Sequence, residues 1–294
     1  MTAIALAAPK RIILRSPGYW KSTFQRLARD KVAMTALGVI AALFLCAIFA
    51  PLIAPADPNA ASMIRRLRPI GTPNYPLGSD ELGRDMLSRL IYGARLSLII
   101  GVTPVPIAFV IGSAIGILAG YAGGLFNTII MRTVDVFYAF PSVLLAVALS
   151  GALGSGLTNT LVSLTVVFIP QIARIAESVT TQVRQLDYVE AARASGAPAY
   201  RIILEQVLGN VLAPIFVFAT SLISVSMILA SGLSFLGLGV RPPDAEWGLM
   251  LNTLRTAIYA NPLVAILPGV MIFITSISFN LLSDGLRSAM DVKS

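Results

Sequence analysis

The sequence contains no histidine and a single cysteine, Cys46. A general base or metal site built on histidine is therefore excluded, and no disulfide can form within the chain. The P-loop pattern GxxxxGK[ST], which cradles the phosphates of ATP, does not occur, nor does the G-x-S-x-G turn that carries a nucleophilic serine. These absences argue against an enzyme. We expect no catalytic residue, no metal site and no cofactor bound by this chain.

Charged side chains are also scarce. They make up 12% of the 294 residues, against about 25% in typical soluble proteins, whereas 56% of the residues are hydrophobic. A soluble domain of this length could not bury so much apolar surface in one core, which indicates that the chain lies in a bilayer. In so apolar a chain, the net charge of +8 indicates basic cytoplasmic loops rather than nucleic-acid binding.

Long stretches without any Asp, Glu, Lys or Arg are present instead. Each is long enough to cross a bilayer, which takes about 20 residues in a helix. The third stretch is too long for one helix, and its three glycines and one asparagine within residues 150–159 favour a turn. Division at that turn predicts an all-α integral membrane protein with six transmembrane helices. The five stretches are residues 32–56, 96–131, 136–173, 206–240 and 256–283.

Six spans place both termini on the same side of the membrane. When that side is assigned to the cytoplasm, 14 of the 22 basic residues lie inside, as the positive-inside rule favours. The first apolar run is longer than a signal-peptide core, so we expect it to remain as an uncleaved helix. The expected organisation is a cytoplasmic tail (1–31), a first transmembrane helix (32–56), an extracytoplasmic loop (57–94), a core of five helices (95–285) and a cytoplasmic C-terminal tail (286–294).

A short polar passage, LDYVEAARASGAPAYRII, lies between two of the apolar stretches. Asp187 is a candidate N-cap, and Glu190 follows three residues later, as in a capping box. Gly196 stands where a glycine ends a helix, and Pro198 prevents its continuation. The passage therefore predicts a short helix that lies off the membrane axis and is followed by a second one.

One narrow face of this helix carries mostly small side chains, which would let another protein approach closely. The face consists of Tyr188, Ala191, Ala192 and Ser195. A plain helix–glycine–helix connector would give the same pattern, and this alternative stays open. A DNA-reading helix-turn-helix is excluded, because three acidic residues balance the three arginines of residues 184–205 and leave no net positive charge for phosphate.

The letters EAARASG, from Glu190 to Gly196, resemble the EAA loop of ABC importer permeases, in which E-A-A is followed by three residues and Gly. Further stretches resemble the second, C-type permease of the dipeptide/oligopeptide/nickel importers, and together they cover nearly everything after about residue 25. They are residues 76–98, 120–149, 233–248 and 279–291. The chain departs from the pattern at Gln206 and Gly209, where the family usually has isoleucine and proline, and at Ser283 and Ser288, where it usually has Gly and Asp.

This resemblance implies an ABC type I importer permease fold with a cytoplasmic EAA coupling helix at about residues 187–196. It implies a multi-pass protein of the bacterial cytoplasmic (inner) membrane that forms half of a translocation path with a second, homologous permease. Two cytoplasmic ATPases, which bind the ATP and Mg²⁺, would each hold one EAA helix, and an extracytoplasmic binding protein would deliver the substrate. The implied ATPase-coupling residues are Tyr188, Glu190, Ala191, Ala192 and Gly196. Dipeptides, oligopeptides, glutathione and nickel chelates all remain open as substrates.

Two outer segments carry charges of both signs, and we expect them to form the surface that receives the binding protein. Solvated loop charges without a partner are the alternative, because exposed ion pairs often contribute little energy. The expected contact residues are Arg65, Arg66, Asp80, Glu81, Arg241, Asp244 and Glu246, with Arg68 and Asp85 beside them.

An ion-coupled secondary transporter is the alternative function. Such carriers hold ionisable residues near the middle of the membrane and contain inverted repeats. The five apolar stretches have no ionisable side chain apart from tyrosine and Cys46, and no internal repeat is apparent. Arg132 and Asp135, spaced i and i+3 near the inner end of the third span, are expected to form a structural ion pair.

Overall fold

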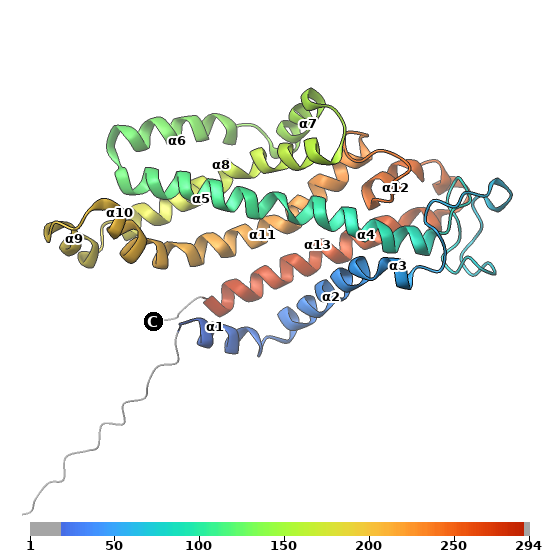
Figure 1. Cartoon of the computed structure of the whole chain (residues 1–294), viewed down its shortest axis with the longest axis horizontal. Helices are drawn as coiled ribbons and strands as arrows, with labels where there is room; N and C mark the ends of the chain where they lie inside the picture. The colour runs from blue at the N-terminus through green and yellow to red at the C-terminus, as the bar shows by residue number, and fades with distance from the viewer. Residues whose placement is uncertain (1–18, 291–294) are drawn as a thin grey trace, which may run out of the picture.

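The computed structural model describes residues 19–290, and its regular secondary structure in that range is helical. The chain folds into one elongated bundle (Figure 1). Its helices are α1 (Tyr19–Leu27), α2 (Lys31–Ile48), α3 (Ala50–Ile53), α4 (Met86–Val102), α5 (Pro104–Ala122), α6 (Gly124–Tyr138), α7 (Ser142–Leu153), α8 (Leu157–Val183), α9 (Asp187–Ala194), α10 (Ala199–Ile202), α11 (Leu208–Phe235), α12 (Trp247–Thr253) and α13 (Pro262–Met290). Short 3₁₀ turns lie at Met63–Arg65 and Ala257–Tyr259, and a π-helical turn at Ile203–Val207 joins α10 to α11.

Five helical segments of the described chain are long and apolar enough to cross a membrane. They are α2, the continuous pair α4–α5, α8, the continuous run from α10 to α11, and α13. The helices α6 and α7 together form a sixth apolar segment, which is bent by 86° at a short break. With this bent pair counted as one span, the structure has the six spans that the sequence predicts.

The turn predicted within the third apolar stretch is confirmed. Helix α7 ends at Leu153 and α8 begins at Leu157, with Gly154 at φ +86° and Gly156 at φ +152° between them. Such positive φ values favour glycine, because a Cβ atom would be strained there. The bend between α6 and α7 lies directly before Pro141, and a residue that precedes proline is disfavoured in helical geometry.

The predicted outer loop, 57–94, ends too late. Helix α4 begins at Met86, with Asp85 as its N-cap, so that Arg89 lies on the helix rather than in the loop. The first helix is also shorter than the predicted 32–56, because α2 ends at Ile48 and α3 at Ile53. The absence of charge therefore marks the apolar middle of a helix better than it marks its ends.

The two ends of the bundle differ in content (Figure 1). Helices α9 and α10 lie at one end, together with α1 and the C-terminal end of α13. The segment between α3 and α4 lies at the opposite end, together with α12. The arrangement agrees with an even number of spans, which brings the EAA passage and both described chain ends to the same side.

Helices α5 and α8 pack closely along their length. Gly112, Gly116 and Gly120 of α5 face the backbone of α8, and a Cβ atom at any of them would overlap with a carbonyl oxygen of α8. Small residues spaced four apart allow such close contact between membrane helices. A second core forms around the fully buried Trp247 of α12, between α2, α4 and α13.

Candidate functional site

The EAA passage forms the eight-residue helix α9, and its N-terminus differs from the prediction. Leu186, with φ −78° and ψ 144°, occupies the N-cap position and gives no side-chain cap. The assignment of Asp187 as the N-cap is therefore wrong, and no capping box with Glu190 forms. Both acids lie in the first turn of the helix instead, where their charge favours the positive end of the helix dipole.

The C-terminus of α9 is as predicted. Gly196 has φ +77°, and its N–H donates to the carbonyl of Arg193 over 3.0 Å. The N–H of Ala197 reaches back to the carbonyl of Ala192 over 3.2 Å, which completes a Schellman motif. No atom would crowd a Cβ at Gly196, so that the backbone conformation, and not lack of space, requires glycine there.

One side of α9 is anchored on the bundle. Val189 is fully buried in the main core, and Ala192 is half-buried against the same core. The hydroxyl of Tyr188 accepts a hydrogen bond of 3.0 Å from the side-chain amide of Asn210 at the start of α11. These contacts fix the helix across the end of the bundle.

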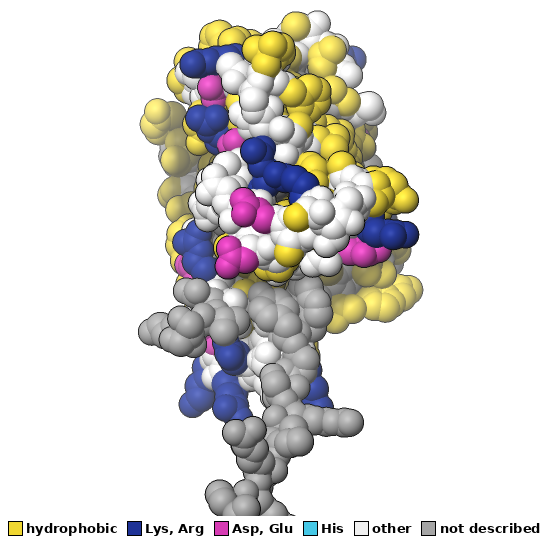
Figure 2. Space-filling model, turned by 90° about the vertical axis from the view of Figure 1, so that its left-hand side faces the viewer, with side chains coloured by type: hydrophobic (Ala, Val, Ile, Leu, Met, Phe, Trp, Pro, Cys, Tyr) yellow, Lys and Arg dark blue, Asp and Glu magenta, His cyan; other side chains and the backbone are white. Residues whose placement is uncertain are grey.

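The opposite side of α9 is exposed, with Glu190, Ala191 and Ser195 on it. The predicted small face is therefore divided: Ala191 and Ser195 point outward, whereas Ala192 packs partly inward. Figure 2 looks onto this end of the molecule, where charged side chains of both signs gather and hydrophobic side chains cover the flanks. The end of the bundle that carries α9 thus has the polar character of a surface in water.

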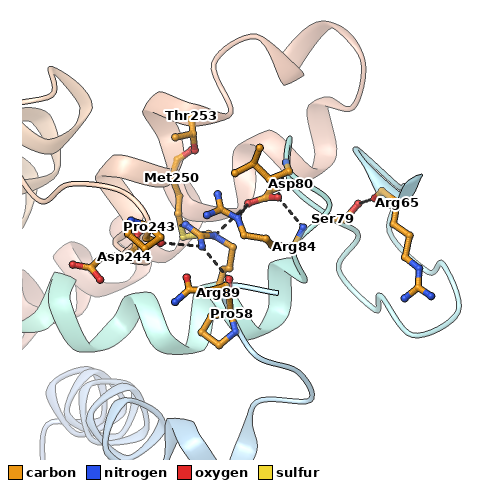
Figure 3. A network of polar contacts seen from close by, with 12 residues as sticks. Pro58, Arg65, Ser79, Asp80, Arg84, Arg89, Pro243, Asp244, Met250 and Thr253 are labelled. Atoms are coloured by element: carbon orange, nitrogen blue, oxygen red, sulfur yellow. Dashed lines mark hydrogen bonds and ion pairs between the residues drawn. The ribbon is translucent and has the colours of Figure 1, made fainter. Parts of the chain in front are cut away.

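At the other end of the bundle, a buried arginine joins the outer segments (Figure 3). Arg89 of α4 is 2% exposed, and its Nε lies 3.4 Å from the carboxylate of Asp80. Its two terminal nitrogens donate to the carbonyls of Pro58 at 3.1 Å and of Pro243 and Asp244 at 3.4 Å each. One side chain on α4 therefore ties the loop between α3 and α4 to the loop between α11 and α12.

Asp80 completes this network. Its carboxylate accepts hydrogen bonds from the backbone N–H groups of Leu82 and Arg84 at 2.9 Å each, and the Nε of Arg84 lies 2.6 Å away. The carboxylate is 4% exposed and is saturated by partners within the chain. The interpretation of Asp80 as a surface charge that contacts a binding protein is wrong, because the folding of the outer loop buries it.

Glu246 is a second charge that the fold withdraws from the surface. It is 1% exposed and accepts hydrogen bonds of 2.8 Å from the backbone N–H groups of Gly248 and Leu249, which caps α12. The hydroxyl of Ser97 on α4 donates to the same carboxylate over 3.1 Å. Burial raises the pKa of Glu246 above its ordinary value, although the backbone donors act in the opposite direction. The interpretation of Glu246 as a surface contact is also wrong.

The other predicted outer residues do reach the surface. Arg65, Arg66, Arg241 and Asp244 are exposed, and Glu81 is partly exposed. Three of them have contacts within the chain. Arg65 lies over the ring of Tyr75 at 5.6 Å, Arg241 donates to Ser155 over 2.9 Å, and Glu81 accepts from Thr256 over 2.6 Å. Beside them, Arg68 is exposed and Asp85 is buried as the N-cap of α4.

The expected ion pair between Arg132 and Asp135 is replaced by another. Asp135 of α6 lies 3.4 Å from Arg174 of α8, and both side chains are partly exposed. Asp135 therefore connects two helices rather than supporting its own. Sequence spacing could not show this, because the bent α6–α7 pair folds back onto α8.

Two protein-family models, both of transport permeases, match separate parts of the chain. Residues 112–293 match the family described as the binding-protein-dependent transport system inner membrane component. Residues 18–69 match the N-terminal TM domain of oligopeptide transport permease C.

Two curated relatives are similar over nearly their full length. The chain is 40% identical to the glutathione transport system permease protein GsiD of Pectobacterium atrosepticum over 95% of this chain and 92% of that protein. It is 41% identical to the di/tripeptide transport system permease protein DppC of Pseudomonas aeruginosa over 94% of this chain and 93% of that protein.

A solved structure supports the fold. The inward-facing MetNI methionine ABC transporter matches with a TM-score of 0.57 and 22% identity, over 69% of this chain and 97% of that one. Together with the family match, this likeness confirms the expected ABC importer permease fold. The chain therefore belongs to the family of binding-protein-dependent transport system inner membrane components and is a multi-pass permease of the inner membrane.

Proposed function

We propose that this chain forms half of the translocation path of an ATP-driven importer for peptides or similar small solutes. The observation that carries the proposal is the division of the molecule into two unlike ends. At one end α9 offers an exposed face on an anchored helix, and at the other a buried ion network holds the outer loops together. The named substrates of the two relatives, glutathione and di/tripeptides, support the substrate class.

The chain itself is non-catalytic in this proposal. The sequence contains no P-loop, so that ATP and Mg²⁺ are held by two cytoplasmic ATPase subunits. One of them receives the exposed face of α9, centred on Glu190 and Ala191. A second, homologous permease completes the path and forms a heterodimer with this chain. Both termini and α9 lie in the cytoplasm, which the distribution of basic residues supports.

The extracytoplasmic binding protein docks on the opposite end. The proposed contact surface keeps only those charges that the fold leaves accessible, and Asp80 and Glu246 stabilise the loops beneath it. The surface consists of Arg65, Arg66, Glu81, Arg241 and Asp244. Because Arg89 ties the loop of Asp244 to α4, a protein that binds this surface would contact a preformed platform.

Uptake by the reconstituted complex tests the function. The chain is purified with its partner permease and ATPases, placed in proteoliposomes with ATP inside, and given the binding protein and a radiolabelled dipeptide, tripeptide or glutathione. We expect uptake of at least one of these probes that requires both ATP and the binding protein. Uptake that proceeds without ATP and stops when an ion gradient across the membrane is dissipated would instead show a secondary transporter.

A further inference from the structure

The inner ends of three helices meet at Tyr121, near the C-terminus of α5. Arg184 reaches it from the end of α8, and Arg193 reaches it from α9. The NH1 group of Arg184 donates to the carbonyls of Gly120 at 3.3 Å and Tyr121 at 3.1 Å. The carbonyls of a final helical turn lack partners within their own helix and carry the negative end of its dipole, so that a guanidinium group is well suited to bind them.

Gly123 makes room for this contact. It has φ +68° as the C-cap of α5, and a Cβ atom at this position would overlap with the guanidinium group of Arg184. The guanidinium group of Arg184 thus lies directly against the turn between α5 and α6. Arg184 fixes the end of α5 to the end of α8, where the close glycine packing of the two helices also ends.

Arg193 makes the contact from α9. Its guanidinium carbon lies 5.6 Å from the centre of the Tyr121 ring, a distance at which a cation is attracted to the face of an aromatic ring. The ring itself packs partly buried against the main core. Tyr121 is thus held through its carbonyl by one helix end and through its ring by another.

The covalent connection from α9 to α11 is less direct than the contact of Arg193 with Tyr121. It passes through Gly196, whose left-handed backbone ends α9, and then through the π-helical turn at Ile203–Val207. Glycine permits changes of backbone angle, and π-helical turns are irregularities often found at functional places in helices. A displacement of α9 reaches α11 along this path and through the hydrogen bond of Tyr188 to Asn210, whereas the contact of Arg193 with Tyr121 leads to α5.

We propose that Tyr121, Arg184 and Arg193 form a joint that carries the displacement of α9 into the packed pair α5–α8. The joint rests on the proposed function, in which an ATPase moves α9. Because α5 and α8 are in contact along the glycine row of α5, a force applied at their shared inner end moves them as a unit. Tyr121 and Arg193 are positioning residues, because they transmit the displacement of α9 to α5 and α8. In this way ATP hydrolysis in a partner subunit changes the translocation path through the membrane.

Matched variants separate this role from a structural one. Arg193→Met removes the charge at similar length and Arg193→Lys keeps it; Tyr121→Leu removes the aromatic ring and Tyr121→Phe keeps it. In the reconstituted complex, we expect Arg193→Met and Tyr121→Leu to lower glutathione or dipeptide uptake per ATP hydrolysed at least fivefold, with the ATPases still co-purifying. The two conservative variants should stay within twofold of the natural chain. The double variant Tyr121→Leu/Arg193→Met should be no worse than either single variant.

A distance measurement tests the direction of the motion. Spin labels are placed in a Cys46→Ser background at Leu118→Cys on α5 or Phe216→Cys on α11, each paired with Val32→Cys on α2; all three side chains are exposed. Electron–electron resonance distances are compared with and without ATP and vanadate. We expect Arg193→Met to abolish the ATP-dependent change at α5 and to retain the change at α11.

The outcomes are distinguishable from failure of the proposed function. Normal uptake per ATP in both Arg193→Met and Tyr121→Leu would overturn the joint. Equal loss of ATPase binding in all four variants would also overturn it, because the contact would then serve only to fold α9. If α9 does not dock an ATPase at all, a bulky residue at the exposed Ala191 will leave co-purification unchanged, which is a separate result.

Discussion

At the residue scale, Arg89 and Asp80 show how the end of the molecule opposite α9 buries its charges. Both lie in a segment that reads as a polar loop, yet neither side chain reaches the surface. Arg89 meets one carboxylate and three carbonyls of other segments. The sequence supplies an arginine beside several acids, but it does not show which of them the fold will bring together.

Loss of Arg89 should therefore destabilise the protein strongly. Arg89→Met leaves Asp80 with Arg84 as its cationic partner and leaves three loop carbonyls without a donor. A buried acceptor that is left without a donor costs about 1–3 kcal/mol. Thermal unfolding of the purified protein in detergent measures this loss. Arg66→Met, at an exposed position in the loop that carries Asp80, is the control and should change stability by less than about 0.5 kcal/mol.

Glu246 predicts a dependence of stability on pH. Burial raises its pKa in the folded protein above the ordinary value of 4.5, so that the folded state binds more protons than the unfolded state between those two values. Stability therefore falls as pH rises through this window. The difference in unfolding temperature between the natural chain and Glu246→Gln should change in that direction from pH 4.5 upward. Asp244→Asn, at an exposed site, is the control; a pH profile unchanged by Glu246→Gln would contradict the prediction.

At the element scale, the apolar stretches predicted the membrane helices because only apolar side chains can face lipid at mid-membrane. They did not predict where α4 begins. Arg95 lies within this helix, and its charge is tolerated there because the guanidinium group donates to the carbonyls of Ala47 at 2.6 Å and Ile48 at 3.1 Å, at the end of α2. A charge that is satisfied by a neighbouring helix is compatible with a membrane segment, but the neighbour is known only from the fold.

Helix α9 shows which parts of a site can be predicted. Gly196 and Pro198 determine its end through their own backbone restrictions, so that the sequence was sufficient. Its start and its orientation depend on Val189 and Ala192, which pack against helices distant in sequence. The division of the small residues into an inward and an outward side could therefore not be predicted from spacing alone.

The close packing of α5 on α8 gives a prediction for Gly116. A Cβ atom at this position would overlap with the carbonyl of Ala173, and the backbone of α8 cannot move away without loss of packing along its length. Gly116→Ala should destabilise the protein by about 1–3 kcal/mol, which is the usual cost of overpacking. Gly38→Ala on α2, where no atom lies within 4 Å of the added Cβ, is the control for thermal unfolding. Equal stability of the two variants would show that α5 and α8 tolerate a wider separation.

At the scale of the whole molecule, the position of α9 relative to the outer loops is a testable consequence of the six-span topology. In a Cys46→Ser background, Ala194→Cys on α9 should be protected from a membrane-impermeant maleimide added to intact cells, whereas Asp244→Cys should be labelled. Both side chains are exposed, so that folding itself does not prevent the reaction. Permeabilised cells serve as the control, in which both positions should react. Labelling of both positions in intact cells would contradict the topology.

The last prediction concerns docking of the ATPase on α9. Ala191 is exposed whereas Ala192 is half-buried, so that a bulky residue at Ala191 tests contact with a partner without disturbing the core of this chain. If a groove of the ATPase fits the small side chain closely, Ala191→Trp should cost about 1–3 kcal/mol of interface and weaken binding roughly tenfold or more.

Gly196→Val should act differently, because a β-branched residue at φ +77° is strained and would tilt the end of α9. Both variants should remain in the membrane with the partner permease bound, yet lose co-purification of the ATPases and uptake. Leu52→Trp, at an 82% exposed site on α3 at the opposite end, is the control and should retain both. Normal uptake by Ala191→Trp and Gly196→Val at normal expression would mean that α9 is only a connector between two membrane helices.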